Sequence, residues 1–318
     1  MAKTFEKIDY RLRPAKNVER KMLVDILRKL EHIYKLKEYQ YIGFGSTYFS
    51  DFRLFHRELG FMEMTSVEKV FQDELRFRFN KPFDCIDIEI GKSEDALPRL
   101  SWSSPTILWL DYEERLKEYM FRDIEQFCSA APVGSVILIT VNATPFNRNN
   151  LDEGETRVDK LRETLNEDNV PPNVSKKDLR KGEMANVYRR IITEKIEKQY
   201  LGPRNTRRSK EEELSYKQLA NFRYQDNALM ATFGGILISD EILNRFHRAN
   251  FDDLPFVKTG DEEYIIQTPN LTFAEMRTLD RMLPSNPVEN EVPVPEEHKE
   301  QYADIYRYFP RFIESQIP

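Results

Sequence analysis

The chain has 318 residues, a length that suits one large elaborated domain or two smaller ones. A hydrophobic content of 40% with 21 Phe and 15 Tyr excludes a disordered chain, because disordered sequences lack the aromatic residues that fill a core. The net charge of −6 argues against a protein that coats nucleic acid with its whole surface. No apolar run approaches the roughly 18 to 20 residues of a membrane-spanning helix, so we expect no membrane partner and a cytoplasmic location.

Cysteine and histidine are too sparse to indicate a metal site. The two cysteines, Cys85 and Cys128, cannot form a disulfide framework, and the four scattered histidines show no metal-ligand spacing. We therefore expect no metal, and we interpret both thiols as structural.

Predicted strands and helices alternate in the first half of the chain. Apolar residues recur at three- and four-residue spacing over 17–33, which predicts an amphipathic helix. Strands are predicted at 39–45, 62–68, 83–90, 105–112 and 134–143, with helices after the first, second and fourth of them. This alternation predicts a doubly wound, mostly parallel α/β sheet covered by helices on both faces. The runs ILWL and VILIT show no polar alternation, so we expect them in the middle of the sheet.

The second half of the chain breaks this pattern. From about 147 to 220 the sequence is charged and helix-favouring without a strand signal, and we interpret it as a helical insertion. Strand-like segments return at 228–239, 254–259 and 263–269. The turn Thr259-Gly260-Asp261 predicts that the last two form a hairpin, so the late edge of the sheet is expected to be antiparallel.

The end of the chain combines a helix with a proline-rich segment. A helix is predicted at 272–283, begun by a capping box of Thr272 and Glu275, and 284–297 is predicted to be an extended tether. We divide the chain into five parts. They are an amino-terminal arm and helix (1–38), an α/β core (39–146), a basic helical insertion (147–224), the remaining strands and helix (225–284) and a carboxyl-terminal tail (285–318).

Glycines end the first predicted strand, in Gly43-Phe44-Gly45-Ser46. Glycine lets the backbone turn tightly and approach a ligand, and doubly wound sheets bind ligands at that edge. An ordinary strand-to-helix turn is the alternative explanation. A dinucleotide fingerprint would need a small residue at position 48, where the chain has Tyr48, so we expect a cofactor without a pyrophosphate.

Acidic residues end the second and fourth predicted strands. The carboxylate of Glu68 can accept both hydroxyls of a ribose, with a surface ion pair to Lys69 or Arg76 as the alternative. Asp111 closes an otherwise apolar strand, where we expect it to face the ligand crevice. Asp95 follows the third strand and either meets an adenine or caps a helix.

Taken in this order, the motifs resemble the class I S-adenosylmethionine-dependent methyltransferases, and in detail a group of bacterial O-methyltransferases of unsettled substrate. The resemblance covers most of the chain outside the helical insertion. It rests on the segments DYRLRPAKNVERKM (9–22), YIGFGSTYFSDF (41–52), TSVEK (65–69), GKSEDALP (91–98), ILWLDYE (107–113), TVNA (140–143) and PNLTFAEMRTLD (269–280). It implies a Rossmann-like fold, S-adenosylmethionine as cofactor and a methyl acceptor of unknown identity.

The resemblance also implies where the cofactor binds. The glycine loop would hold its methionine part, the acid after the second strand its ribose, and the segment after the third strand its adenine, with the fourth strand bordering the methyl group. The residues carried over are Gly43, Phe44, Gly45, Ser46, Glu68, Lys69, Ser93, Asp95 and Asp111. One position departs, because the third glycine of the loop falls on Thr47. A relative that has lost methylation and serves as a regulatory, nucleic-acid- or protein-binding subunit is therefore the alternative.

Candidate catalytic residues follow the fourth and fifth strands. Transfer to an oxygen or nitrogen needs in-line approach and removal of the acceptor's proton. The candidates are Asp111, Tyr112 and Asn142. The segment TVNATP lacks the Asn/Asp-Pro-Pro-aromatic signature of transfer to the amino group of a base, so a DNA adenine methyltransferase is not indicated.

Two regions are strongly basic. The first surrounds the start of the first helix and is either a solvated arm or a lid over the crevice; its basic residues are Arg11, Arg13, Lys16, Arg20 and Lys21. The second, residues 171–210, holds 12 Lys or Arg and 4 Asp or Glu, a net charge of +8. It is either a contact for a polyanion or protein, or a solvated helical surface.

Overall fold

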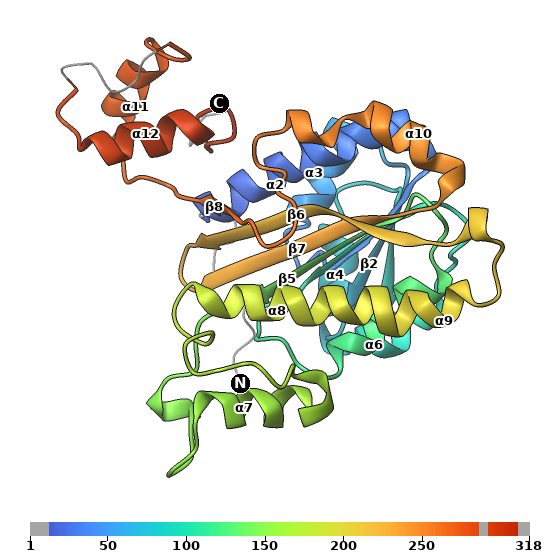
Figure 1. Cartoon of the computed structure of the whole chain (residues 1–318). Coiled ribbons are helices and arrows are strands. Elements are labelled where there is room, and N and C mark those ends of the chain that lie inside the picture. The colour runs from blue at the N-terminus through green and yellow to red at the C-terminus, as the bar shows by residue number, and fades with distance from the viewer. Residues whose placement is uncertain (1–12, 286–291, 311–318) are drawn as a thin grey trace.

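A single eight-stranded sheet organises the chain. The computed structural model describes residues 13–285 and 292–310. Strand order across the sheet is β3-β2-β1-β4-β5-β7-β6-β8. The strands are β1 Gln40–Gly43, β2 Glu63–Glu68, β3 Ile86–Ile90, β4 Thr106–Asp111, β5 Val136–Asn142, β6 Ser215–Gln225, β7 Leu229–Ile238 and β8 Tyr264–Ile266. Strands β1 to β5 run parallel and β7 runs antiparallel to both its neighbours (Figure 1), which confirms the mostly parallel sheet with antiparallel late strands.

Helices cover both faces of this sheet (Figure 1). The first face is covered by α2 Pro14–Arg28, α3 Ser50–Leu59, α4 Glu74–Asn80 and α10 Asp240–Ala249. The second face is covered by α5 Ser93–Ala96, α6 Met120–Ala130, α7 Arg157–Leu165 and α8 Glu183–Glu194, with the short α9 Gly202–Asn205 following. Helices α11 Phe273–Asp280 and α12 Glu296–Ile305 lie apart from the sheet, and Leu279 and Tyr302 belong to a small apolar cluster between them.

Side-chain alternation along β4 explains its continuous apolar sequence. Ile107 and Trp109 are buried in the core under α2 and α3, whereas Leu108 and Leu110 are buried in the core under α6 and α8. A strand buried on both faces needs apolar residues at every position. Asp111 follows in the Ile107 and Trp109 row, so its side chain emerges on the α2 face of the sheet.

Strand β6 was missed, because it lies at the end of the stretch interpreted as a helical insertion. Its polar residues suggested a solvated helix, but in the structure their side chains form hydrogen bonds to other segments of the chain. Gln218 donates to the Lys258 carbonyl at 2.8 Å, and Asn221 donates to the Glu262 carbonyl at 2.6 Å. These amides fasten a loop to the strand, which is why a sheet strand carries them.

The predicted late hairpin is wrong. Residues 254–259 form an irregular segment with one turn rather than a strand, and β8 pairs parallel with β6. The extended tether is wrong for its described part as well, because Val292 is buried in the apolar cluster with Leu279 and α12 begins at Glu296. The capping box of Thr272 and Glu275 at the start of α11 is confirmed.

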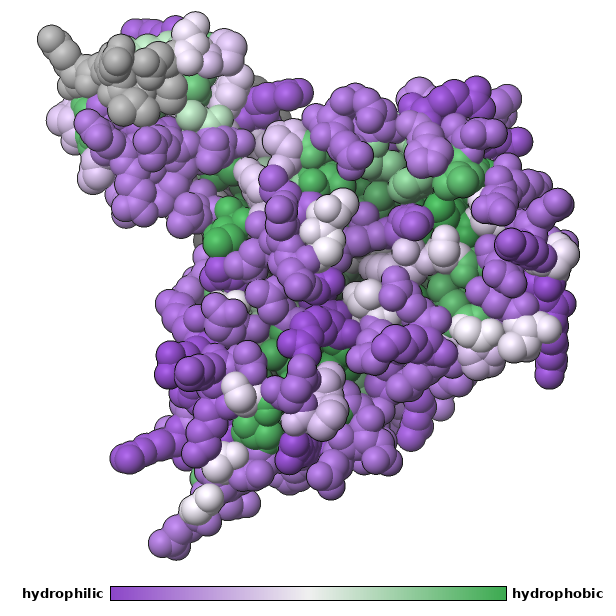
Figure 2. Space-filling model, in the orientation of Figure 1, coloured by the Kyte–Doolittle hydropathy of each residue, from purple (hydrophilic) through white to green (hydrophobic). Residues whose placement is uncertain are grey.

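The face shown in Figure 2 is mainly hydrophilic, with apolar groups between charged residues. None of the helices in the described ranges combines the length and apolar character needed to cross a membrane.

Candidate functional site

The sheet register brings three predicted site residues to one edge. Gly43 at the end of β1 lies between Ser66 of β2 and Trp109 of β4. Glu68 and Asp111 each follow two residues later, so both project from the carboxyl edge on the same face as Gly43. Because β1 has β2 on one side and β4 on the other, this edge is also the switch point at which the chain changes direction across the sheet.

The loop after β1 is tightly packed at Gly45, where there is no room for a side chain. A Cβ on Gly45 would lie 2.6 Å from Ser66 Oγ and 2.7 Å from Phe49 Cδ1. Ser46 and Phe49 adopt left-handed backbone with φ of 52° and 48°. Thr47 does not have positive φ, so the residue that replaces the third glycine is not the strained one. The expected close-packed loop is present without that glycine.

Glu68 fastens this loop to β2. Ser66 donates to Glu68 Oε1 at 2.7 Å, and the Gly45 amide donates to Ser66 Oγ at 3.0 Å. Burial raises the pKa of Glu68 to about 7, while the Ser66 hydroxyl and the amides of Ser46 and Gly45 act to lower it. Glu68 is only 7% exposed, whereas Lys69 beside it is exposed, so the burial of Glu68 does not favour the alternative of a surface ion pair with Lys69. Glu68 is thus a buried carboxylate at the carboxyl edge of the sheet.

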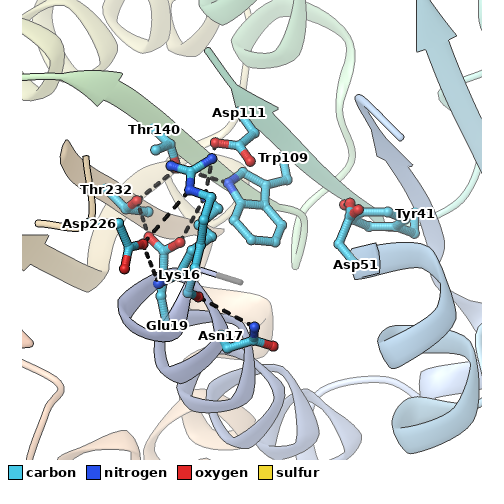
Figure 3. A network of polar contacts seen from close by, with 11 residues as sticks. Lys16, Asn17, Glu19, Tyr41, Asp51, Trp109, Asp111, Thr140, Asp226 and Thr232 are labelled. Carbon is cyan, nitrogen blue, oxygen red and sulfur yellow. Dashed lines mark hydrogen bonds and ion pairs between the residues drawn. The ribbon is translucent and has the colours of Figure 1, made fainter. Parts of the chain in front are cut away.

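Asp111 is held by a lysine from the first helix (Figure 3). Lys16 Nζ lies 2.9 Å from Asp111 Oδ1 and 2.8 Å from Glu19 Oε2. It also lies 4.5 Å from the centre of the Trp109 ring, a cation–π distance. The Lys16 side chain is 1% exposed, whereas that of Asp111 is 27% exposed. The lysine is therefore enclosed, while the carboxylate it holds reaches solvent.

A chain of hydrogen bonds runs from this pair into the sheet (Figure 3). Trp109 Nε1 donates to Thr140 Oγ1 at 3.0 Å, and Thr140 Oγ1 lies 2.7 Å from Thr232 Oγ1. Thr232 in turn donates to Glu19. The chain links β4, β5, β7 and α2, so the end of β4 and the first helix are fixed as one unit.

The amino terminus of α2 is bound by the turn between β6 and β7. Asp226 accepts the amides of Ala15 and Lys16 at 3.0 and 3.1 Å, and Arg13 lies 3.7 Å from it. A carboxylate at a helix amino terminus satisfies amides that have no partner within the helix. The expectation of a solvated arm is wrong for Lys16 and Arg20, which are buried, and Arg11 lies outside the described residues.

Asp51 of α3 adds another buried carboxylate near the loop. The Tyr41 hydroxyl donates to it, as Figure 3 shows beside the Lys16 network. Burial raises the pKa of Asp51, and the charge of Arg20 opposes that shift. The basic residues of α2 thus face the acidic edge of the sheet.

Tyr112 points away from Asp111. Its hydroxyl donates to Asp123 of α6, which also accepts from Ser93 Oγ at 2.5 Å. Burial raises the pKa of Asp123 to about 6, and the two hydroxyls oppose the shift. The Tyr112 ring lies edge-on to Phe44 at 5.5 Å. The structure therefore brings Phe44, Ser93 and Tyr112 together on the α6 face.

Asp95 and Asn142 lie at the margins of this arrangement. Asp95 is exposed in the first turn of α5 and has no side-chain capping bond, so the capping alternative is not supported. Asn142 accepts the Thr144 amide at 2.8 Å and lines an open pocket of about 330 Å³. Arg115, Phe146 and other residues complete the lining, namely Glu114, Lys117, Asn150, Lys160 and Thr164.

Several buried polar atoms have no hydrogen-bond partner within the described structure, among them Thr47 Oγ1 in the glycine loop and Asp123 Oδ1 behind Ser93. Buried polar groups are ordinarily paired, so such atoms mark places where a ligand can bind. In the described ranges, no three His, Cys, Asp or Glu side chains gather as a metal-binding group.

The basic stretch 171–210 directs several cations inward. Arg189 pairs with Asp261, Arg204 donates to the carbonyls of Cys128 and Ala131, and Lys195 lies 4.5 Å from the Phe121 ring centre. Its net charge therefore overstates the positive surface that this stretch presents.

Sequence reasoning missed Asp123 and the pairing of Lys16 with Glu19. One signal was available for the pair. Lys16 directly precedes the helix predicted at 17–33 and lies three residues from Glu19, a spacing at which a lysine and a glutamate can pair on one face of a helix. Nothing comparable marks Asp123 among the charged residues of α6.

Several solved structures resemble part of this chain at low identity and with TM-scores below 0.5. Trm1 from Pyrococcus horikoshii, in complex with S-adenosyl-L-methionine, is 12% identical, with 76% of this chain and 61% of that chain covered and a TM-score of 0.49. A "putative methyltransferase" from Thermobifida fusca YX is 15% identical, with 48% and 61% covered and a TM-score of 0.31. Human N-acetylserotonin methyltransferase in complex with SAM is 12% identical, with 65% and 50% covered and a TM-score of 0.33.

The chain thus spans less than two thirds of the length of each of these three structures. No curated protein sequence matches it significantly. A family profile, in contrast, matches nearly its whole length, residues 8–317. The chain belongs to the family described as "Putative O-methyltransferase".

Proposed function

We propose that the protein transfers the methyl group of S-adenosylmethionine to an acceptor, with an oxygen as the acceptor atom that the family description suggests. The observation that carries this proposal is the placement of Glu68 and Asp111 on either side of the glycine loop, on one face of the sheet at its switch point. Doubly wound sheets bind their ligands at this edge.

The described residues fit the cofactor in three places. The loop of Gly43 to Ser46 would receive the amino-acid end, where the unpaired Thr47 Oγ1 offers a further polar contact. Glu68 would accept ribose hydroxyls, with Lys69 at the exposed rim. Ser93 and Asp123 would lie toward the adenine, and Asp123 Oδ1 has no hydrogen-bond partner in the described structure. Asp95 would approach the adenine from the solvent side. When bound, the cofactor supplies an activated methyl group.

On the acceptor side, the candidate residues take different roles in the proposal. Asp111 reaches solvent at the end of β4 and is the proposed site for taking up an acceptor proton. Asn142 would orient the acceptor in the pocket of about 330 Å³ that it lines. The Tyr112 hydroxyl is bound to Asp123, so we propose that its ring forms a wall beside Phe44 rather than a base.

A second proposal concerns the basic insertion. Arg157, Lys176 and Arg180 line an open depression of about 470 Å³. This concentration of positive charge favours contact with a polyanion or an acidic protein surface, as part of the enzyme or of a regulatory subunit that does not methylate. A cytoplasmic site of action, in a bacterium, stays a prediction.

Isothermal titration with S-adenosylmethionine tests the proposed function. We expect binding that weakens by about 1 to 3 kcal/mol in Glu68→Ala, the range for losing hydrogen bonds to a charged group. Glu58→Ala is the matched control, because Glu58 is exposed on α3 and pairs only loosely with Arg28 at 3.4 Å. Wild-type protein that binds neither S-adenosylmethionine nor S-adenosylhomocysteine would contradict the proposal and favour the regulatory alternative.

A further inference from the structure

Three charged groups lie together at the end of β4, where the proposed site meets the first helix. Lys16 is in contact with both Asp111 and Glu19, and Glu19 is fully buried. The trio contains two carboxylates and one ammonium group. Asp111 Oδ1 faces Lys16, and the Asp111 side chain is 27% exposed at the carboxyl edge of the sheet.

The position of Lys16 is fixed by more than its ion pairs. Its side chain passes the Trp109 ring, and Tyr224 lies 5.7 Å from Nζ on another side. Its backbone amide is bound by Asp226 at 3.1 Å. These contacts restrain the ammonium group beside Asp111, so it would contribute a nearly constant field at the carboxyl edge of the sheet.

The charge at this place matters because the cofactor and its product differ in charge. S-adenosylmethionine carries a positive sulfonium, whereas S-adenosylhomocysteine has a neutral sulfur. A carboxylate beside the sulfur would favour binding of the positively charged S-adenosylmethionine. If this bound state were stabilised too strongly, methyl transfer would be slower, because the sulfur loses its positive charge during the reaction. A nearby fixed cation weakens this preference.

We infer that Lys16 and Glu19 together set how strongly the site discriminates between S-adenosylmethionine and S-adenosylhomocysteine, by fixing the net charge around Asp111. This inference rests on the proposed function. Lys16 is a specificity-determining residue supplied by α2, outside the segments that carry the glycine loop and the acidic strand ends.

The test compares the ratio of the two affinities in variants that change this charge in opposite directions. Lys16→Met makes the trio more negative, so S-adenosylmethionine should gain about tenfold relative to S-adenosylhomocysteine. Glu19→Gln makes it less negative, and the ratio should fall by about three- to tenfold. The double variant restores the original charge, so its ratio should return to that of the wild type.

The double variant also guards against misfolding. Removing one member of a buried ion pair is strongly destabilising, whereas replacing both is often tolerated. If Lys16→Met does not fold, Glu19→Gln and the double variant still give a lowered and a restored ratio. Lys21→Met is the matched control, since Lys21 lies on the same helix and donates to the Phe309 carbonyl at 3.3 Å.

Each result is read from calorimetric titrations of the purified full chain with both ligands. Opposite shifts in the single variants and a restored ratio in the double variant support the inference. Equal changes in both affinities would show that Lys16 acts only on stability, and would overturn it. Absence of binding in the wild type would instead contradict the proposed function, and the inference would fall with it.

Discussion

Replacing Glu68 with glutamine should remove a pH dependence of stability that the buried carboxylate imposes. Burial raises the pKa of Glu68 from 4.5 to about 7. The folded protein therefore binds this proton more tightly than the unfolded chain, so stability falls as the pH rises from about 4.5 to about 7. A shift of this size corresponds to roughly 3 kcal/mol, because one pKa unit is about 1.4 kcal/mol.

Urea unfolding at a series of pH values between 4.5 and 8 measures this contribution. The free energy of unfolding of Glu68→Gln, relative to wild type, should rise by roughly 3 kcal/mol across that window, since glutamine carries no charge to desolvate. Glu58→Gln, at an exposed position of α3, should change little with pH. Parallel pH profiles for Glu68→Gln and wild type would refute the burial argument.

Three further predictions follow from the same contacts. Gly45→Ala should lower the free energy of unfolding by about 1 to 3 kcal/mol in urea titrations, because its Cβ would meet Ser66 and Phe49; unchanged stability would contradict the packing of the loop. Asp123→Ala should cost about 2 to 4 kcal/mol by leaving the Tyr112 and Ser93 hydroxyls unpaired, and a neutral effect would contradict that network. If 171–210 contacts a polyanion, RNA binding measured by fluorescence anisotropy should weaken steeply with salt, and absence of binding at low salt would exclude the contact.

The main features of the candidate site could be predicted because each one directly follows a buried strand. Gly43, Glu68 and Asp111 are the last residues of β1, β2 and β4, and parallel strands bring their carboxyl ends to one edge whatever the details of packing. The mostly parallel arrangement of these strands follows from the same alternation of strand and helix. This part of the fold can therefore be predicted from short stretches of the sequence.

Contacts between distant segments were not predictable in the same way. Lys16 and Asp111 are 95 residues apart, and only the docking of α2 on the sheet buries the lysine against the carboxylate. Strand β6 was hidden for the same reason, since Asn221 is polar in sequence but bound to the Glu262 carbonyl in the fold. The burial of a charged or amide side chain can be recognised only when its binding partner is known. For Lys16 and Asn221 that partner lies far away in the sequence.

A crystal structure of the complex with S-adenosylhomocysteine would test the central claim most directly. We predict the ligand at the carboxyl edge of the sheet, with its ribose hydroxyls on Glu68, its amino-acid end on the loop of Gly43 to Ser46, and its sulfur on the side of Asp111. A ligand bound elsewhere, with Glu68 making only its contacts to Ser66 and the loop, would contradict the account.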